Sequence, residues 1–427
     1  MESNIEENQT EETNLNYKLK NKKIYFSRDS FFELNSYPYL FLLIISQFKP
    51  QSIISLSNHY HNGFIFEGIN LIWIFAQLLS FLIISYRYMK NHKIHLFNII
   101  FFLSVLYIGL VSFLNGTPVS RIASILIPPI SIFMLLELTY RYQTFYKLIN
   151  TIYIYFGSMI ILNYISMLIF PDSFFTDYRG LNVTWIFGNY QQNLNWFIVF
   201  IAFSCFVKEI WNEYIKYFNM LVYLIIILTT VKVWSATTLS ALGIVFGLLI
   251  CYHFYPRISI FLNPFYAYIV GIITTILIVV YKIQEHFTYF IEIVLQKNVS
   301  FTGRTTLWEN AINYIKEKPI FGHGIELADV TFAKIGKTTA HNHYLNLLYN
   351  GGILYLLLTS ILIYIVVVKT KSNRYSKSIV YINISLIGYF VYFLAEAKIN
   401  LNIFILLLAG SYYLSKSLNS KVKSINY

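Results

Sequence analysis

The chain carries little charge for its length of 427 residues, because Asp, Glu, Lys and Arg together make up only 12% of it. A soluble globular chain carries about 25%. The shortage is uneven, since ten long windows contain none of these four residue types: 68–86, 94–120, 148–171, 180–207, 217–231, 233–256, 258–281, 344–368, 378–395 and 399–415. A helix needs roughly 20 apolar residues to cross a bilayer. The sequence therefore excludes an ordinary soluble domain and predicts a protein with many membrane spans.

Cysteine is also scarce, and its two copies, Cys205 and Cys251, both lie inside apolar windows. They exclude a disulfide framework and are expected to act as small hydrophobic residues. The apolar windows lack the alternation of polar and apolar residues that is typical of outer-membrane strands. Because a spanning segment must pair its own backbone groups, the windows predict helices.

Lysine and arginine are distributed unevenly between the two sides of the predicted membrane. Twelve spans are predicted, at 35–48, 67–86, 96–115, 121–138, 148–170, 193–207, 217–231, 234–254, 263–281, 347–368, 378–396 and 400–415. With the N-terminus inside, 20 of the 32 Lys and Arg residues fall on the inner side, and 5 fall in the short outer loops. The remaining 7 lie in one long outer segment. The positive-inside rule therefore predicts that both termini are cytoplasmic.

The predicted fold is an all-α membrane protein of about 12 transmembrane helices, with one long extracytoplasmic loop that carries short interfacial helices. Span interiors contain almost no ionisable residues, which argues against an ion-coupled transporter and directs attention to the outer loops. The predicted regions are a cytoplasmic tail at 1–34, helices one to nine at 35–281, the loop at 282–346, helices ten to twelve at 347–415 and a tail at 416–427.

The first half of the long outer loop predicts an amphipathic helix. Thr306 and Glu309 have the spacing of a capping box, and Pro319 ends the pattern before a turn at 321–324. The apolar stripe consists of Leu307, Trp308, Ala311, Ile312 and Ile315, so the helix is expected to lie on the bilayer surface. Arg304 stands just before the predicted helix start, where a guanidinium beside unpaired N–H groups suits a phosphate.

The second half of the loop contains His341 and His343 at the outer mouth of a span. Two imidazoles can share a metal ion, but a site needs further ligands, and the sequence has no HExxH pattern or carboxylate-rich cluster nearby. No metal and no cofactor are therefore predicted. Taken alone, these histidines are typical of interfacial polar residues.

Taken together, the motifs of this loop resemble the O-antigen ligase and polysaccharide polymerase (Wzy-type) family. The ordered motifs are Thr302-Gly303-Arg304, Trp308, Pro319-x-x-Gly322-x-Gly324, His341-Asn342-x-x-Leu345 and Gly351-Gly352-Ile353. The resemblance is close over about 280–360. It extends more loosely to Arg179-Gly180, Phe187-Gly188-Asn189 and Asn193.

The resemblance implies an inverting, metal-independent membrane glycosyltransferase. Its substrate would be an oligosaccharide on undecaprenyl pyrophosphate in the outer leaflet of a bacterial cytoplasmic membrane. A flippase and a chain-length regulator would be candidate protein partners. The basic net charge does not imply a nucleic-acid partner, since the positive-inside rule accounts for it.

Polymerisation of repeat units into a capsule, exopolysaccharide or O-antigen is one reading of the function, and transfer of a finished glycan by a ligase is the second. A flippase is a third reading, from a different class of protein. A composition typical of an AT-rich genome favours the polymerase.

The chemistry of the reaction assigns roles to the remaining residues. A departing pyrophosphate needs preorganised positive charge when no metal is present, and Arg304 and Arg179 are the predicted ligands. The chain departs from the family pattern at Ala236, which replaces an arginine, and Lys232 is the candidate to supply that charge. His341 is the predicted general base, since an imidazole titrates near neutral pH, and Asn342 is expected to orient it. Further candidates for contact with the acceptor or a sugar are His343, His323, Trp308 and Tyr344.

Overall fold

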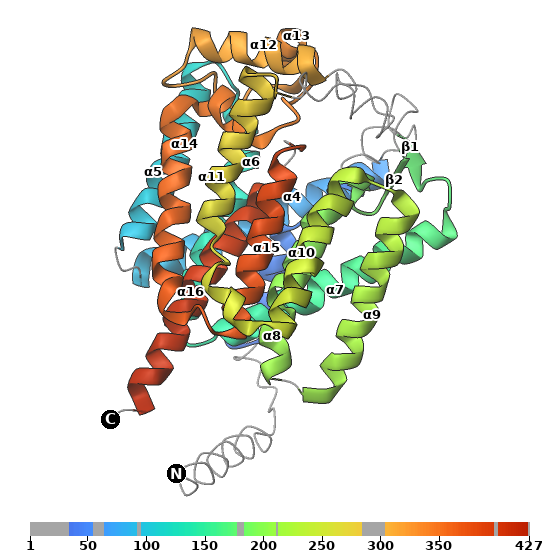
Figure 1. The fold of residues 1–427 in the computed structure, drawn as a ribbon, viewed down its shortest axis with the longest axis vertical. Helices are drawn as coiled ribbons and strands as arrows, with labels where there is room; N and C mark the ends of the chain where they lie inside the picture. Colours follow the sequence, from blue (N-terminus) through green and yellow to red (C-terminus); the bar gives the residue numbers. More distant parts are fainter. Residues whose placement is uncertain are drawn as a thin grey trace, which may run out of the picture.

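The computed structural model describes residues 34–53, 64–91, 95–176, 183–210, 212–283, 304–396 and 400–425. This part of the chain is helical apart from one small sheet, so the predicted all-α membrane fold is confirmed (Figure 1). The helices that correspond to predicted spans are α2 (Tyr37–Gln47), α4 (Phe64–Asn91), α5 (Leu96–Leu114), α6 (Val119–Arg141), α7 (Phe145–Ile169), α8 (Asn193–Ile210), α9 (Asn212–Val233), α10 (Ala236–Phe254), α11 (Pro264–Thr275), α14 (His343–Thr370), α15 (Lys377–Phe393) and α16 (Leu401–Ile425).

Each predicted span overlaps one of these helices. By length and composition, eight of them can cross a membrane, and α2, α15 and the stretch Pro264–Val280 are shorter apolar helices. With 11 residues, α2 is about 16 Å long, roughly half the thickness of the hydrocarbon layer. The stretch after α11 continues as a π-helical turn, η4 (Ile276–Val280), and single 3₁₀ turns follow α10 and α14 at η3 (Pro256–Ile260) and η7 (Lys371–Asn373).

The centre of the bundle is formed by α8, α15 and α16. Helix α15 packs against α8, α10 and α11, and α16 packs against α6 and α14. Nearly every side chain from Leu194 to Val207 is buried. Peripheral helices such as α4 expose large apolar side chains, including Leu71, Ile72 and Phe75. An apolar outer surface of this extent suits lipid rather than water.

Two further helices form a cap across one end of the bundle. They are α12 (Arg304–Glu317) and α13 (Ala328–Ile335), and Figure 1 shows them in orange, lying roughly across the ends of α11 and α14. A small antiparallel sheet lies towards the same end, with strands β1 (Phe175–Thr176), β2 (Val183–Trp185) and β3 (Gly188–Asn189) in the order β1-β2-β3. It pairs Phe175 with Thr184, and the 3₁₀ turn η2 (Tyr190–Gln192) joins it to α8.

A buried acidic group near the end of α6 is an exception to the shortage of ionisable residues in the predicted spans. Glu137 of α6 is only 1% exposed. Its Oε2 atom accepts hydrogen bonds from Tyr88 (2.8 Å) and Asn98 (2.7 Å), and its Oε1 atom pairs with Arg141. A buried carboxylate is tolerated when charge and hydrogen bonds compensate it. The network joins α4, α5 and α6.

Two predicted boundaries also shift. Helix α14 begins at His343, so the last residues of the predicted outer loop belong to a helix. Helix α16 continues to Ile425, well past the predicted end of the last span at 415. The predicted tail at 416–427 is therefore largely a helical extension.

Candidate active site

The underside of the cap is apolar, as the sequence predicted, but it faces protein rather than lipid. Leu307, Trp308 and Ala311 of α12 are buried in one cluster with Val279 of η4 and Tyr349 of α14. The expectation that α12 lies on the bilayer surface is therefore corrected. The helix also starts at Arg304, two residues before the predicted capping box, and it ends at Glu317, close to the expected stop at Pro319.

Trp308 connects the cap to the segment that carries the predicted general base. Its indole Nε1 donates a hydrogen bond to the carbonyl oxygen of Ala340 at 3.0 Å, and the side chain is only 6% exposed. Ala340 is fully buried. The hydrogen bond gives Trp308 a structural role, in which the ring holds the backbone immediately before His341, and its predicted contact with a sugar stays a prediction.

His341 has a left-handed backbone conformation, with a φ of 47°. Such values are uncommon outside glycine, although asparagine, aspartate and histidine adopt them more often than other residues. The residue is partly buried and lies between the fully buried Ala340 and Asn342, which is 2% exposed. Because both neighbours are anchored, the imidazole is presented from a defined backbone position. Unusual backbone conformations held in this way are concentrated at functional sites.

Asn342 is the N-cap of α14, and its side chain has three partners. Its Oδ1 atom accepts from the backbone N–H of Leu345 at 3.1 Å. Its Nδ2 atom donates to Thr275 Oγ1 at 3.1 Å and to the Leu394 carbonyl at 3.0 Å. Asn342 therefore joins the ends of α11, α14 and α15. The structure supports an orienting role for Asn342 through the backbone next to His341.

His343 and Tyr344 lie in the packed core at the start of α14. His343 is 8% exposed, and its ring meets the Phe393 ring edge-on at 4.3 Å. Tyr344 is 2% exposed, and its hydroxyl donates to the Phe390 carbonyl at 3.1 Å. Both rings are therefore packed among the helices of the bundle, and their predicted contacts with substrate stay predictions.

His323 is likewise structural. It is 3% exposed, its ring stacks on Tyr349 at 5.1 Å, and its Nε2 atom lies 2.7 Å from the carbonyl oxygen of Tyr314. Since a carbonyl only accepts, Nε2 must carry the proton in this arrangement. A histidine held in this way is poorly placed to act as the base for a substrate hydroxyl.

The glycine motifs of the outer loop and of α14 pack against each other and are joined by backbone hydrogen bonds. Gly352 interrupts α14 with φ 60° and ψ −164°, and a Cβ atom there would overlap the Ile320 carbonyl. The break leaves carbonyl groups for other partners. Tyr349 and Asn350 accept from the N–H groups of His323 (2.8 Å) and Gly324 (2.7 Å). The two glycine motifs, which the sequence analysis identified by their spacing alone, thus attach the cap to the bundle.

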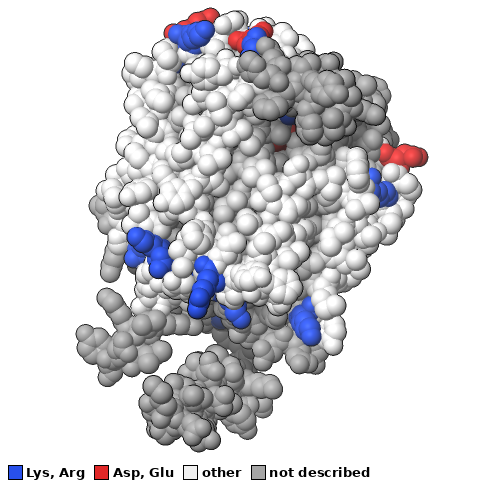
Figure 2. All heavy atoms as spheres, viewed as in Figure 1, with Lys and Arg blue, Asp and Glu red and all other residues white. Residues whose placement is uncertain are grey.

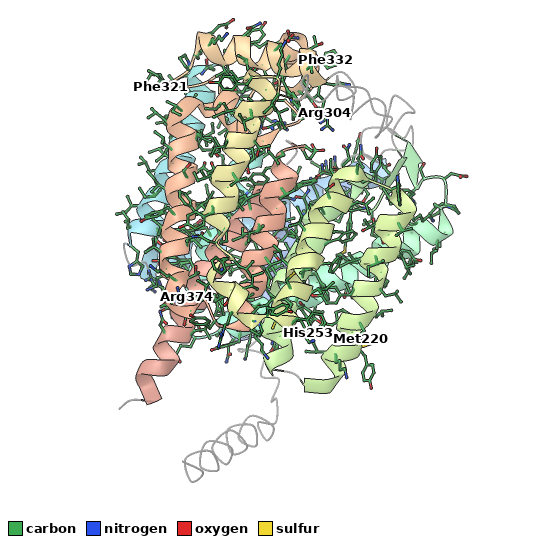
Figure 3. The ribbon with its side chains drawn as sticks, in the orientation of Figure 1. Met220, His253, Arg304, Phe321, Phe332 and Arg374 are labelled. Atoms are coloured by element: carbon green, nitrogen blue, oxygen red, sulfur yellow. The ribbon has the colours of Figure 1, made fainter. Side chains whose placement is uncertain are left out.

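Arg304 is the first residue of α12 and so belongs to the cap. Figure 3 shows it facing the membrane-spanning helices, whereas His253 and Arg374 lie at the opposite end of the molecule. Burial lowers the pKa of the Arg304 guanidinium, and the negative charge of Glu396 opposes that shift. Arginine still remains charged at any physiological pH. A partly desolvated cation at a helix N-terminus is well suited to bind an anion.

Glu396 is the residue near this site that the sequence analysis missed. It follows α15 and is 1% exposed. A single carboxylate at the predicted edge of a span carries no spacing signal, so only the fold brings it to Arg304.

The structure gives less support to the other two cations that were predicted to bind the pyrophosphate, Lys232 and Arg179. The Nζ atom of Lys232 donates to the carbonyl oxygen of Met167 at 2.6 Å, which ties the end of α9 to α7 and uses at least one of its donors. Figure 1 places this end of α9 beside the sheet and away from α12. Arg179 lies outside the described residues, so its predicted role stays a prediction.

A comparison with protein families agrees with this geometry. Residues 223–360 match the family model described as O-Antigen ligase. The chain is similar to this family over the matched segment, which is less than half of its length. The resemblance inferred from the loop motifs is thereby confirmed, and the match begins well before 280, within α9.

The matched segment contains Lys232, Arg304, Trp308 and His341 together with the Gly351-Gly352 break. Glu396 and the Arg179 stretch lie outside it. No curated protein and no solved structure matches the chain. Within the described residues, no three His, Cys, Asp or Glu side chains are close enough to hold a metal ion. Metal independence stays a prediction.

Proposed function

We propose that the protein polymerises lipid-linked oligosaccharide units on the outer face of a bacterial cytoplasmic membrane. The observation that carries the proposal is the hydrogen bond from Trp308 to Ala340. It joins the helix that begins with Arg304 to the residue before His341, inside the segment that matches the family model. One small region therefore combines a cation suited to a pyrophosphate with an imidazole suited to proton transfer.

In the proposed reaction, a hydroxyl of the acceptor sugar attacks the anomeric carbon of the donor sugar. His341 takes the proton of that hydroxyl as the new glycosidic bond forms. The bond from the anomeric carbon to the pyrophosphate breaks, and the lipid pyrophosphate leaves with the electron pair. Arg304 and Arg179 stabilise the charge of the leaving group. The anomeric centre is inverted because the hydroxyl attacks from the face opposite the leaving group.

A ligase is the second candidate, because the matching family model is described as O-Antigen ligase. Both reactions use the same donor chemistry and differ in the acceptor. A ligase would transfer a complete glycan to another molecule, whereas a polymerase would extend the glycan itself. The acceptor therefore decides between the two.

Deletion of the gene should separate these functions when surface polysaccharide is sized on a gel. A strain that lacks a polymerase should keep single repeat units on its lipid carrier or surface. Loss of a ligase should instead leave long lipid-linked chains that are not transferred. Complete absence of outer-leaflet intermediates would contradict both readings and indicate a flippase.

We also propose that the cap is extracytoplasmic and that both termini are cytoplasmic. Figure 2 shows Lys and Arg side chains gathered at the end of the bundle opposite the cap, which supports this orientation through the positive-inside rule. The exposed residues Lys337, just after α13, and Lys371, at the far end of α14, suit a labelling test.

In a background without Cys205 and Cys251, Lys337→Cys is expected to react with an impermeant maleimide in intact cells or spheroplasts. Lys371→Cys is expected to react only after the membrane is permeabilised. Labelling of intact cells at Lys371→Cys but not at Lys337→Cys would invert the topology, and the proposed outer-leaflet reaction would fail with it.

A further inference from the structure

Five amide side chains at the cap end of the bundle take no part in the proposed reaction. They come from the turn η2 and the start of α16, each together with the residue before it, and are Asn189, Gln191, Gln192, Asn400 and Asn402. All five are half-buried. These residues form an amide cluster, in which every side chain can both donate and accept hydrogen bonds.

Backbone partners fix the orientation of three of these amides. The Oδ1 atom of Asn189 accepts from the backbone N–H of Gln191 at 3.1 Å, and the Oδ1 atom of Asn400 accepts from that of Asn402, also at 3.1 Å. The Nδ2 atom of Asn402 donates to the Gln47 carbonyl at 3.0 Å. Since a backbone N–H only donates and a carbonyl only accepts, the opposite half of each amide is settled. It is an NH2 group at Asn189 and Asn400 and a carbonyl oxygen at Asn402.

These opposite halves bond to none of the described residues. They are not buried either, so they are accessible in a fixed orientation. The side-chain amide of Gln191 also bonds to none of the described residues, although its backbone carbonyl accepts from the Tyr392 hydroxyl at 2.6 Å. A polar group that is oriented before a ligand arrives loses little freedom on binding. The amide cluster is therefore preorganised for a ligand that forms hydrogen bonds.

Tyr389 of α15 joins the two parts of the amide cluster. Its hydroxyl donates to Asn195 Oδ1 at 2.6 Å and lies 3.4 Å from the carbonyl oxygen of Asn400. Asn195 in turn donates from Nδ2 to Gln192 Oε1 at 2.9 Å. The start of α8 and the start of α16 are therefore held together through α15, which brings their amides to one place.

The end of α15 also connects the amide cluster to the candidate base. Tyr392 bonds the carbonyl of Gln191, and two residues later the carbonyl of Leu394 accepts from Asn342, the neighbour of His341. The amide cluster and the backbone next to His341 are thus both attached to the last turn of α15. This arrangement places a hydrogen-bonding surface beside the imidazole that is proposed to act on the acceptor hydroxyl.

We propose that the amide cluster binds a sugar of the acceptor oligosaccharide. This inference rests on the proposed function, because it takes His341 as the base for the acceptor hydroxyl. The five side chains are uncharged, which suits a polyhydroxylated ligand rather than a pyrophosphate. A sugar hydroxyl both donates and accepts, so it can pair with the NH2 group of Asn400 or with the side-chain carbonyl of Asn402. The amide cluster holds the acceptor while Arg304 binds the leaving group of the donor.

The test measures binding of lipid-free oligosaccharide repeat units to the full-length purified protein by calorimetric titration. The repeat units are released from the surface polysaccharide of the host strain by mild acid hydrolysis. Gln191→Ala removes an amide that bonds to none of the described residues, so it should raise the Kd about fivefold, as expected for one neutral hydrogen bond. Asn189→Ser and Asn400→Ser each lose the NH2 group but keep an oxygen that can accept from the same backbone N–H.

The three changes together should raise the Kd on the order of a hundredfold, with a melting temperature close to that of the wild type. Asn313→Ala removes an exposed amide from α12 and is the matched control, with no expected change in the Kd. Arg304→Ala should also bind the oligosaccharide as the wild type does, because the probe carries no pyrophosphate. Should the triple variant not accumulate as folded protein, Gln191→Ala alone makes the comparison.

The outcomes distinguish this inference from the proposed function. If the wild type extends a lipid-linked glycan but the triple variant binds the oligosaccharide as tightly as the wild type, only the role of the amide cluster is overturned. Equal weakening in the triple variant and in Asn313→Ala overturns it as well. If the wild type neither binds the oligosaccharide nor extends a lipid-linked glycan, both proposals are overturned.

Discussion

Replacement of His341 by alanine is expected to abolish long-chain product while the protein still accumulates in the membrane. A positioned general base is typically worth about 10²–10⁴-fold in rate, and no other histidine described near the cap is placed to substitute for it. His323 bonds a backbone carbonyl, and His343 packs against Phe393. The measurement is complementation of a deletion strain, scored by polysaccharide chain length and by protein abundance.

The backbone conformation of His341 suggests a variant that tests the imidazole with less effect on folding. Because its φ is 47°, alanine at this position adds conformational strain to the loss of the imidazole. Asparagine tolerates left-handed backbone, so His341→Asn should remove the base with less cost to folding. Both variants are expected to lose product equally, with His341→Asn closer to wild type in abundance and thermal stability.

His343→Ala serves as the control for nearby damage. It removes a ring that packs on Phe393, so it should lower stability modestly and reduce product only as far as protein level falls. Full complementation by His341→Asn would show that the imidazole is not the base. The general-base role would then have to be sought outside His341.

Loss of the Arg304 guanidinium should have the second large effect. Arg304→Ala is expected to reduce turnover by about a hundredfold or more, because removal of one preorganised stabilising group at a developing charge typically costs that much. Arg304→Lys should retain part of the activity, since it keeps the charge but loses the two-pronged hydrogen bonding of a guanidinium. The assay uses purified protein with a lipid pyrophosphate donor in excess EDTA, which also checks the predicted metal independence.

Lys316→Ala provides a matched control on the same helix. Lys316 is an exposed cation near the other end of α12, so its loss changes the net charge of the cap without removing the Arg304 guanidinium. Its turnover should equal that of the wild type. Equal losses in Lys316→Ala and Arg304→Ala would mean that the cap needs positive charge in general, and normal turnover in Arg304→Ala would reduce Arg304 to an interfacial anchor.

Much of the fold could be predicted because a lipid environment imposes strong local rules. A span must be long, apolar and helical, so charge-free windows locate the helices to within a few residues. The exceptions have physical causes. Glu137 is compensated by Tyr88 and Asn98, which are distant in sequence, and by Arg141 one helical turn away. Helix α14 starts early because Asn342 caps it.

For the candidate site, the sequence by itself determined which residue types lie at the outer mouth of the bundle and in what order. Motif spacing located Arg304 and His341, but it also named Trp308, His323, His343 and Tyr344 without showing that all four are buried. Spacing measures separation along the chain, whereas burial depends on what other segments bring alongside.

Only the tertiary structure decided how the site is assembled. The bond from Trp308 to Ala340 and the three partners of Asn342 bring α12, α14 and α15 to one region. The same packing lets the charge of Glu396 act on the pKa of Arg304, although the two residues are 92 positions apart in the chain. Apolar helices can pack in many ways, and a few directional hydrogen bonds and glycine breaks select one of them. Those contacts join residues that are far apart in sequence, so no local pattern records them.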